Sequence, residues 1–114
     1  MRIKVNEASG IALDWMVAKC VEADEGMCSA LGLFTTTTRK IKFSTDRIYG
    51  GLIIERERIS VMSDYHEIKE GWFAEGYDNG VQAFGATPLI AGMRCYVASE
   101  LGEEADIPEE LCEK

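Results

Sequence analysis

Polar side chains that could bind a ligand lie at several points within otherwise apolar stretches of this sequence. A charge in such surroundings either pairs with an opposite charge or contacts a ligand, because an isolated buried charge is costly. These positions, together with one tryptophan that could stack on a ring, are the candidate ligand-binding residues Asp46, Glu55, Arg56, Trp72, Thr87 and Arg94.

Arg94 is the strongest of these candidates, because it lies in the middle of an expected helix and beside its apolar stripe. A guanidinium there could bind a carboxylate or a phosphate through two parallel hydrogen bonds. The simpler interpretation, which we favour, is an internal ion pair with Asp14, Asp46 or Glu55. The sequence alone leaves both interpretations open.

Thr87 and Trp72 also have a structural and a functional interpretation. Thr87 precedes Pro88 and is expected to cap a helix, although the N-terminus of a helix also binds anions. Trp15 and Trp72 are more typical of a core or an interface than of a ligand-stacking site. For each of these residues we expect the structural role first.

No residue pattern indicates catalysis, a metal or a cofactor. His66 has no nucleophile or second histidine at a recognisable spacing, and Gly50-Gly51 lacks the spacing of a phosphate-binding loop. The cysteines are far apart and form no C-x-x-C pair, which argues against zinc. We therefore expect a non-enzymatic protein without a cofactor or metal, whose cysteines are free thiols.

The composition opposes several classes of function. The chain has 114 residues, with 20 acidic and 12 basic side chains and a formal net charge of −8. This charge disfavours binding to nucleic acid and to anionic membrane surfaces. No apolar run reaches the roughly 18 to 20 residues of a membrane-spanning helix, and no signal peptide is recognisable. We expect a cytosolic protein that does not contact a membrane.

Hydrophobic periodicity predicts the elements of the first half of the chain. A short strand is expected at residues 2–5, followed by a helix that Asn6 or Ser9 could cap and that is apolar over much of its surface through residues 11–21. Residues 22–38 are typical of a loop. A brief strand at 41–43, a cap among residues 44–46, a break at Gly50-Gly51 and a short helix at 52–58 are expected next.

The second half of the chain is predicted to form a three-stranded meander and a final helix. The strands are expected at residues 59–62, 72–77 and 81–84, with turns at 65–71 and 78–80. The helix begins after Thr87 and ends at Gly102. The predicted fold is α+β, with two layers: a small antiparallel sheet, with short extra strands, packed against the N-terminal and C-terminal helices. Residues 1–102 form one domain, and 103–114 form an acidic tail with at most local docking through Ile107 and Leu111.

Several short segments together carry a family resemblance. They are Ala12–Trp15 with Val17–Lys19, Ser44–Asp46, Gly50-Gly51, Ile53–Glu57, and Thr87–Ala91 with Met93-Arg94 and Val97–Ser99. This combination resembles the NinX-like proteins of bacteriophages, a family of unknown function. The resemblance implies a phage accessory protein that acts in the host cytoplasm. Arg47 and Leu52 depart from the family, whose members tend to have tryptophan and proline at those positions.

Three hypotheses of function follow. The first is a homo-oligomeric protein that sequesters an anionic host ligand, such as a nucleotide immune signal. Arg56 and Arg94 would bind its anionic groups, Trp72 would stack on it, and the helix at 11–21 would form the oligomer contact. The second is an inhibitor that binds a host or defence protein through an acidic surface. The third, a module like a double-stranded RNA-binding domain, is weaker because residues 87–90 contain no basic side chain.

Overall fold

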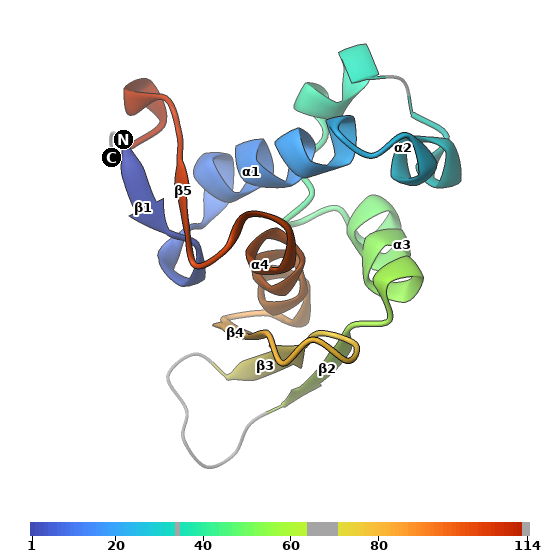
Figure 1. The fold of residues 1–114 in the computed structure, drawn as a ribbon, viewed down its shortest axis with the longest axis vertical. Helices are drawn as coiled ribbons and strands as arrows, with labels where there is room; N and C mark the ends of the chain where they lie inside the picture. The colour runs from blue at the N-terminus through green and yellow to red at the C-terminus, as the bar shows by residue number, and fades with distance from the viewer. Residues whose placement is uncertain (34, 64–70, 113–114) are drawn as a thin grey trace.

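The computed structural model describes residues 1–33, 35–63 and 71–112 and shows a mixed α+β fold (Figure 1). A three-stranded antiparallel sheet lies at one end of the molecule, with helices stacked on one of its faces. A separate two-stranded antiparallel sheet lies beside the helices and away from the larger sheet. The α+β class predicted from the sequence is confirmed.

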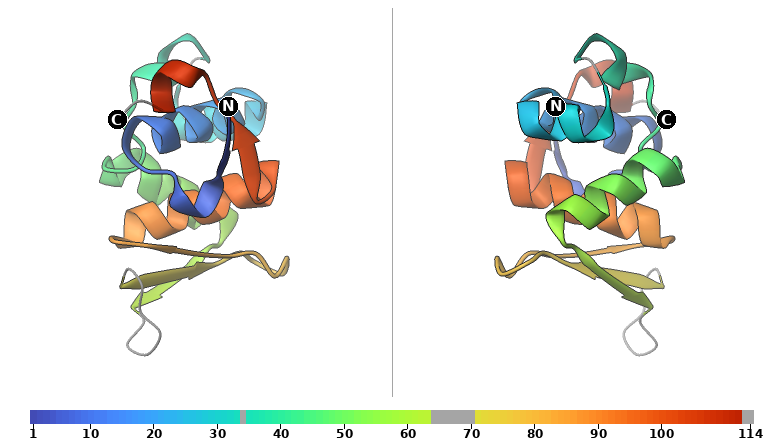
Figure 2. Two further views of the ribbon diagram at one scale, coloured as in Figure 1. Left: turned by 90° about the vertical axis from the view of Figure 1, so that its left-hand side faces the viewer. Right: turned by 90° about the vertical axis from the view of Figure 1, so that its right-hand side faces the viewer.

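Helix α4 (Pro88–Leu101) is the central element of the fold. Its start is as predicted, because the Thr87 hydroxyl accepts a hydrogen bond from the backbone N–H of Ile90 at 3.1 Å and Pro88 occupies the first turn. Residues 91–97 are all buried. The sheet covers one side of α4, and helix α1 (Gly10–Glu22) packs on it from the other side (Figure 2). The N-terminal helix therefore packs on α4 rather than on the sheet.

The larger sheet is the predicted meander. Strands β2 (Ser60–Ser63), β3 (Trp72–Glu75) and β4 (Gln82–Gly85) pair in that order, all antiparallel. Asp78 and Gly80 have positive φ angles in the turn between β3 and β4, where the sequence predicts a tight turn. The predicted turn at 65–71 falls almost entirely on residues 64–70, outside the described part of the chain.

The N-terminal segment forms strand β1 (Arg2–Lys4), a 3₁₀ turn η1 (Val5–Glu7) and helix α1. Neither predicted cap residue caps α1 with its side chain: Ser9 makes no such bond, and the Asn6 amide oxygen instead accepts a hydrogen bond from the backbone N–H of Phe84. The apolar surface of α1 is mostly buried inside this chain, through Leu13, Met16, Val17, Ala18, Cys20 and Val21.

The prediction of a loop at residues 22–38 is wrong. Helix α2 (Glu25–Leu31) begins after Asp24, whose side chain accepts a hydrogen bond from the backbone N–H of Met27, and it ends at Gly32 in the left-handed conformation. A 3₁₀ helix η2 (Thr35–Lys40) follows. These local cap signals were present in the sequence, but the short and weakly apolar α2 gives too little periodicity to reveal a helix.

Two further predictions in the next segment are wrong. Residues 41–43 form no strand, and helix α3 (Arg47–Glu57) runs through the glycine pair that was expected to break the chain. Asp46 caps α3 by accepting hydrogen bonds from the backbone N–H groups of Ile48 and Tyr49. A Cβ added at Gly50 would lie 2.6 Å from Leu89 Cδ1, so this glycine provides room for α4 inside a continuous helix.

The segment after Gly102 contains a strand that the sequence analysis missed. Strand β5 (Glu104–Asp106) pairs antiparallel with β1, with Ala105 opposite Ile3, and the 3₁₀ turn η3 (Glu109–Cys112) follows. The predicted docking of Ile107 and Leu111 is confirmed, since Ile107 is 3% exposed and Leu111 packs against the core. The two ends of the described chain therefore lie side by side (Figure 1).

Candidate functional site

Arg94 occupies a fixed position inside the molecule. Its side chain is buried, and the residue as a whole is 4% exposed. Its Nε donates a hydrogen bond to the backbone carbonyl of Ala8 at 2.8 Å, and its Nη1 donates to the carbonyl of Phe84 at 2.7 Å. Because these carbonyls belong to the segment before α1 and to β4, one guanidinium joins the N-terminal segment, the sheet and α4.

The acidic residues expected to pair with Arg94 have other roles. The Asp14 carboxylate accepts a hydrogen bond from the backbone N–H of Ser44 at 2.7 Å, and Asp46 caps α3. Glu55 is exposed on α3. The two bonds of Arg94 described above are made to backbone carbonyls, which a sequence pattern cannot identify because every residue carries one.

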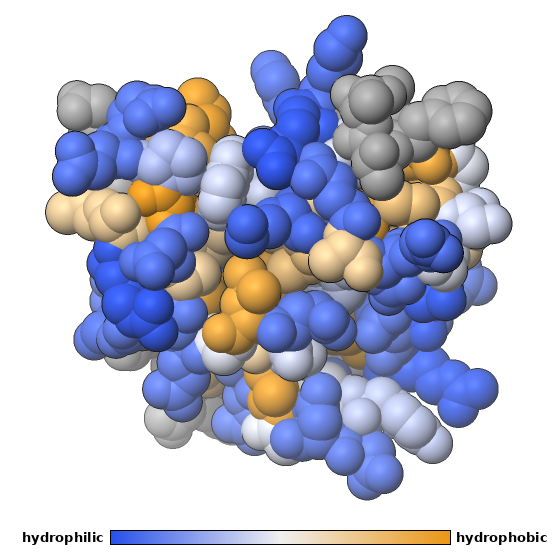
Figure 3. Space-filling model, turned by 45° about the horizontal axis from the view of Figure 1, so that its top comes forward, coloured by the Kyte–Doolittle hydropathy of each residue, from blue (hydrophilic) through white to orange (hydrophobic). Residues whose placement is uncertain are grey.

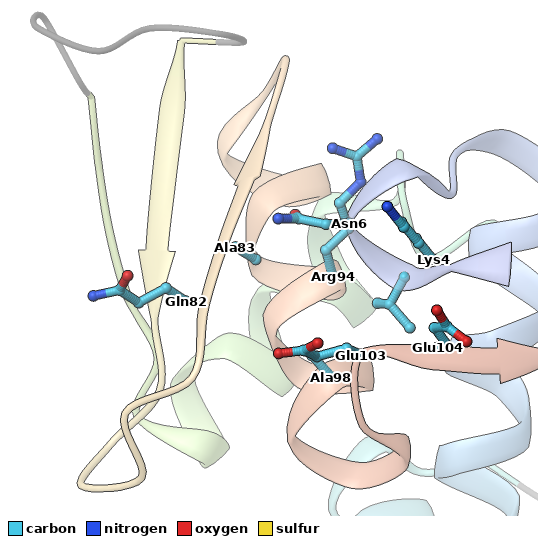
Figure 4. A pocket seen from close by; sticks show the side chains of 9 residues that line it. Lys4, Asn6, Gln82, Ala83, Arg94, Ala98, Glu103 and Glu104 are labelled. Atoms are coloured by element: carbon cyan, nitrogen blue, oxygen red, sulfur yellow. The ribbon is translucent and has the colours of Figure 1, made fainter.

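Arg94 also lines a cavity of about 260 Å³, the Arg94 cavity. Four segments of the chain form its wall. The lining residues are Lys4, Val5, Asn6, Gln82, Ala83, Arg94, Ala98, Glu103 and Glu104. Figure 4 shows Lys4 beside Glu104, which is its cross-strand partner in the pairing of β1 with β5, Glu103 further away, and the guanidinium of Arg94 near Asn6. The wall therefore carries groups of both charges.

Backbone contacts hold the wall of the Arg94 cavity together. The N–H of Val5 donates to the carbonyl of Glu103 at 2.8 Å, and the Asn6 amide oxygen accepts from Phe84 N–H at 3.0 Å. Glu104 accepts a hydrogen bond from Arg2 at 3.0 Å, which neutralises part of its charge. Lys4, Asn6, Glu103 and Glu104 were not among the candidates from the sequence, because their proximity depends on the missed pairing of β1 with β5.

Arg56 lies in a second cavity, of about 380 Å³. Its guanidinium forms an ion pair with Glu57 at 3.3 Å, so it both lines a cavity and pairs internally. We name this the Tyr96 cavity, after the buried tyrosine in its wall. It is lined by Arg56, Glu57, Arg58, Ile59, Gly76, Tyr77, Asn79, Tyr96, Ser99 and Glu100.

Thr87 lines a third cavity, of about 540 Å³, beside the N-termini of α3 and α4. The cap predicted at Thr87 is confirmed, and its hydroxyl oxygen is used for that bond. The other lining residues are Ser44, Thr45, Arg47, Ile54, Pro88, Leu89 and Ile90. Arg47 brings a basic side chain close to the start of α4, although residues 87–90 themselves contain none.

Trp72 is half-buried in β3, opposite Ser63 and Gly85 in the sheet, and packs against the core. Its role in stacking on a ligand stays a prediction. Arg94, Arg56 and Thr87 line three different cavities.

The buried thiols are poor nucleophiles. Burial raises the pKa of Cys20 to about 12 and that of Cys95 to about 11, and the pKa of Cys28 is also raised by burial. All three are free cysteines. Thiols with raised pKa values are mostly protonated at neutral pH, so they act as small apolar groups in the core.

The described residues contain neither a cluster of metal-binding side chains nor a membrane-spanning helix. Across residues 1–33, 35–63 and 71–112, no cluster of three or more histidine, cysteine or acidic side chains is arranged to hold a metal ion. His66 lies outside this part of the chain. None of the helices in the same ranges has the length and apolar character needed to cross a membrane.

The comparisons with known proteins identify one family. The family model described as bacteriophage P22 NinX matches residues 4–100, which is most of the chain and includes every candidate residue from the sequence. No curated protein and no solved structure matches the chain.

Proposed function

This chain belongs to the NinX family of bacteriophage P22, a family of phage proteins, and from that premise we propose that it is a non-enzymatic accessory protein that sequesters a small anionic host ligand in the Arg94 cavity. A nucleotide signal of host immunity is one ligand of this class. Sequestration requires only a pocket with complementary charge, and no catalytic group.

The observation that carries this proposal is the position of two basic side chains in the wall of one cavity. Arg94 is held by the carbonyls of Ala8 and Phe84, so its charge is already in place before a ligand arrives. Lys4 extends into the same cavity from β1 (Figure 4). A preorganised cation loses little conformational freedom on binding, which favours affinity for an anionic group.

The acidic side chains in the cavity wall act against an anionic ligand. Glu104 lies opposite Lys4 in the pairing of β1 with β5, and its charge is partly offset by Arg2, whereas Glu103 is exposed and lies further from Lys4. Both lie outside residues 4–100, which the family model matches. We expect the anionic group to lie at the Lys4 end, and the Glu103→Gln variant to bind the ligand more tightly than the wild-type protein.

The proposed oligomer has less support from α1 than the sequence suggested. Most apolar residues of that helix are buried within the chain, and Ile11 remains 67% exposed. On the face shown in Figure 3, hydrophobic side chains form small separate patches among hydrophilic ones. We retain a homo-oligomer and action in the host cytoplasm as parts of the proposal, with Ile11 as the first residue to test in the subunit contact.

Native mass spectrometry of the purified protein tests the proposal, because one sample reports both the number of subunits and any retained small molecule. The expected result is an additional mass of nucleotide size that is lost in the Lys4→Ala variant. Lys42→Ala is the matched control, since it removes the same charge from an exposed position outside the cavity lining. A strict monomer without retained or added nucleotide would overturn the proposal.

The second candidate is an inhibitor of a host or defence protein. It is favoured by exposed acidic residues on and around β5 and η3: Glu103, Glu104, Asp106, Glu109 and Glu110. Such a surface suits a basic partner and gives fast, salt-sensitive association. The test is affinity capture from host lysate with the wild type and with a Glu109→Lys, Glu110→Lys double variant. A partner bound equally by both proteins would contradict this candidate.

A further inference from the structure

The hydroxyl of Tyr96 is a buried polar group without a hydrogen-bond partner. The residue is 1% exposed, and its Oη is the buried side-chain nitrogen or oxygen among the described residues that has no partner. A buried hydroxyl normally finds a partner, because it loses its hydrogen bonds to water on folding. Tyr96 lines the cavity of about 380 Å³ described above, which is many times the roughly 30 Å³ of one water molecule.

The basic side chains of the Tyr96 cavity are already engaged. Arg56 pairs with Glu57 at 3.3 Å. The guanidinium of Arg58 lies over the ring of Tyr77, 5.2 Å from its centre. The ion pair offsets the charge of Arg56, whereas Arg58 keeps its charge but is held against the Tyr77 ring.

Two neutral polar side chains of the cavity, Asn79 and Ser99, are also satisfied. Asn79 donates from Nδ2 to the Ser99 hydroxyl at 3.1 Å, and its Oδ1 accepts from Val81 N–H at 2.9 Å. The Ser99 hydroxyl donates to the carbonyl of Cys95 at 2.9 Å. The amide and the hydroxyl therefore have partners within the protein.

Glu100 is the group that remains beside Tyr96. It lies four residues further along α4, so both side chains project from the same face of the helix. Glu100 is exposed to solvent, and the described residues provide its carboxylate with no hydrogen bond or ion pair. Burial, and to a smaller extent the nearby charges of Glu57 and Asp24, raise the pKa of Glu100. Burial also raises the pKa of Tyr96, and the nearby carboxylates of Glu100, Glu57 and Asp24 add to this effect. The charged residues that line the cavity are two arginines and two glutamates, and among the described residues Glu100 is the one of these four with no ion pair or ring contact.

We propose that the Tyr96 cavity binds a primary ammonium group, which donates hydrogen bonds to the Tyr96 hydroxyl oxygen and to the Glu100 carboxylate. An ammonium group has three donors and no acceptor, which matches one hydroxyl oxygen and one carboxylate. It also reduces the repulsion between Glu100 and Glu57. The carboxylates of Glu100 and Glu57 would repel an anion. A water molecule would satisfy the Tyr96 hydroxyl but would not offset the negative charge of Glu100.

This ammonium group can belong to a free polyamine or to a lysine side chain, and the experiment separates the two sources. Isothermal titration of the full-length protein uses putrescine as the free amine, Nα-acetyllysine amide as the lysine probe and 1,4-butanediol as the uncharged analogue of putrescine. Stronger binding of putrescine identifies a free amine as the ligand, whereas stronger binding of the lysine probe identifies a side chain. Either result supports the ammonium site.

Substitutions test whether the two named groups make the site. Glu100→Gln and Tyr96→Phe are each expected to weaken amine binding by about tenfold or more, the effect of losing one hydrogen bond to a charged group. Tyr96→Phe should fold normally, since the hydroxyl it removes has no partner. Glu110→Gln is the matched control, because it removes one carboxylate from an exposed position in η3.

Three results would overturn the ammonium site: no binding of either amine, equal binding of butanediol, or an equal loss of affinity in Glu110→Gln and Glu100→Gln. The last result would indicate nonspecific attraction to the negative net charge. The Arg94 cavity shares no lining residue with the Tyr96 cavity, so failure at one site is distinguishable from failure at the other.

Discussion

Gly92 of α4 lies directly against the side chain of Ile54 of α3. A Cβ atom added at Gly92 would stand 2.5 Å from Cδ1 and 2.8 Å from Cγ1 of Ile54, closer than packed atoms can approach. Gly50 and Leu89 repeat the relationship in the opposite direction, with the glycine on α3 and the aliphatic side chain on α4. The two helices therefore interlock through two glycine–aliphatic contacts.

The Gly92→Ala variant is expected to lose about 1–3 kcal/mol of unfolding free energy, the usual cost of overpacking a core. Urea denaturation measures this loss. In an Ile54→Ala background the added methyl group has room, so the same substitution should cost at least about 1 kcal/mol less. Gly51→Ala is the control: a Cβ there meets no atom within 4 Å, and we expect a gain of about 0.4–1 kcal/mol. Equal losses at both glycines would contradict the interlocking contact.

Elements with local start and stop signals could be predicted from the sequence. Thr87, Pro88 and Gly102 delimit α4 through interactions with neighbouring residues, and the structure confirms its helical extent. Gly50 was misinterpreted as a break because the sequence does not reveal its close contact with Leu89. Strand β5 was missed for a similar reason, since its partner is at the other end of the chain.

For the candidate site as well, local features could be predicted from the sequence and long-range contacts could not. The apolar surroundings of Arg94 correctly marked it as a buried charge. Its carbonyl acceptors, on Ala8 and Phe84, could not be inferred, because they are backbone groups brought close by tertiary packing. Tyr96 was not among the candidate residues, since the lack of a partner for its hydroxyl among the described residues is visible only in three dimensions.

Arg94→Met should destabilise the protein by about 3 kcal/mol, because it removes two charge-assisted hydrogen bonds and leaves the carbonyls of Ala8 and Phe84 unsatisfied. Arg94→Lys keeps the charge but loses the planar fork, so an intermediate loss is expected. Thermal and urea unfolding measure both variants. Arg47→Met is the matched control at an exposed position and should change stability by less than about 0.5 kcal/mol. An equal effect at Arg47 would show that Arg94 does not brace the fold.

Truncation after Gly102 should destabilise the protein by several kcal/mol, and not simply remove a tail. It deletes β5, the buried side chains of Ala105 and Ile107, and the hydrogen bond from Ile107 N–H to the carbonyl of Met1. Urea denaturation compares the truncated and full-length chains. Truncation after Pro108 is the control, because it retains these groups. If the chain ending at Gly102 were as stable as the control, residues 103–108 would be dispensable for the fold.

The ion pair between Glu22 and Arg39 should make stability depend on pH. Arg39 Nε donates to Glu22 at 2.6 Å, and this hydrogen bond holds the pKa of Glu22 below its ordinary value. A carboxyl whose pKa is lower in the folded state adds stability above its unfolded pKa, and that contribution disappears as the pH falls through the folded pKa.

The wild-type protein should therefore be more stable than the Glu22→Gln variant at pH 7, and the difference should shrink progressively as the pH falls below the ordinary value of 4.5. Urea denaturation between pH 3 and 7, at about 0.1 M salt and again at about 1 M, measures the difference. Because Arg39 is partly exposed, high salt should reduce it. In an Arg39→Met background most of the pH dependence should vanish, since the main cause of the lowered pKa is removed. A difference between wild type and Glu22→Gln that stays constant across this pH range would contradict the ion pair.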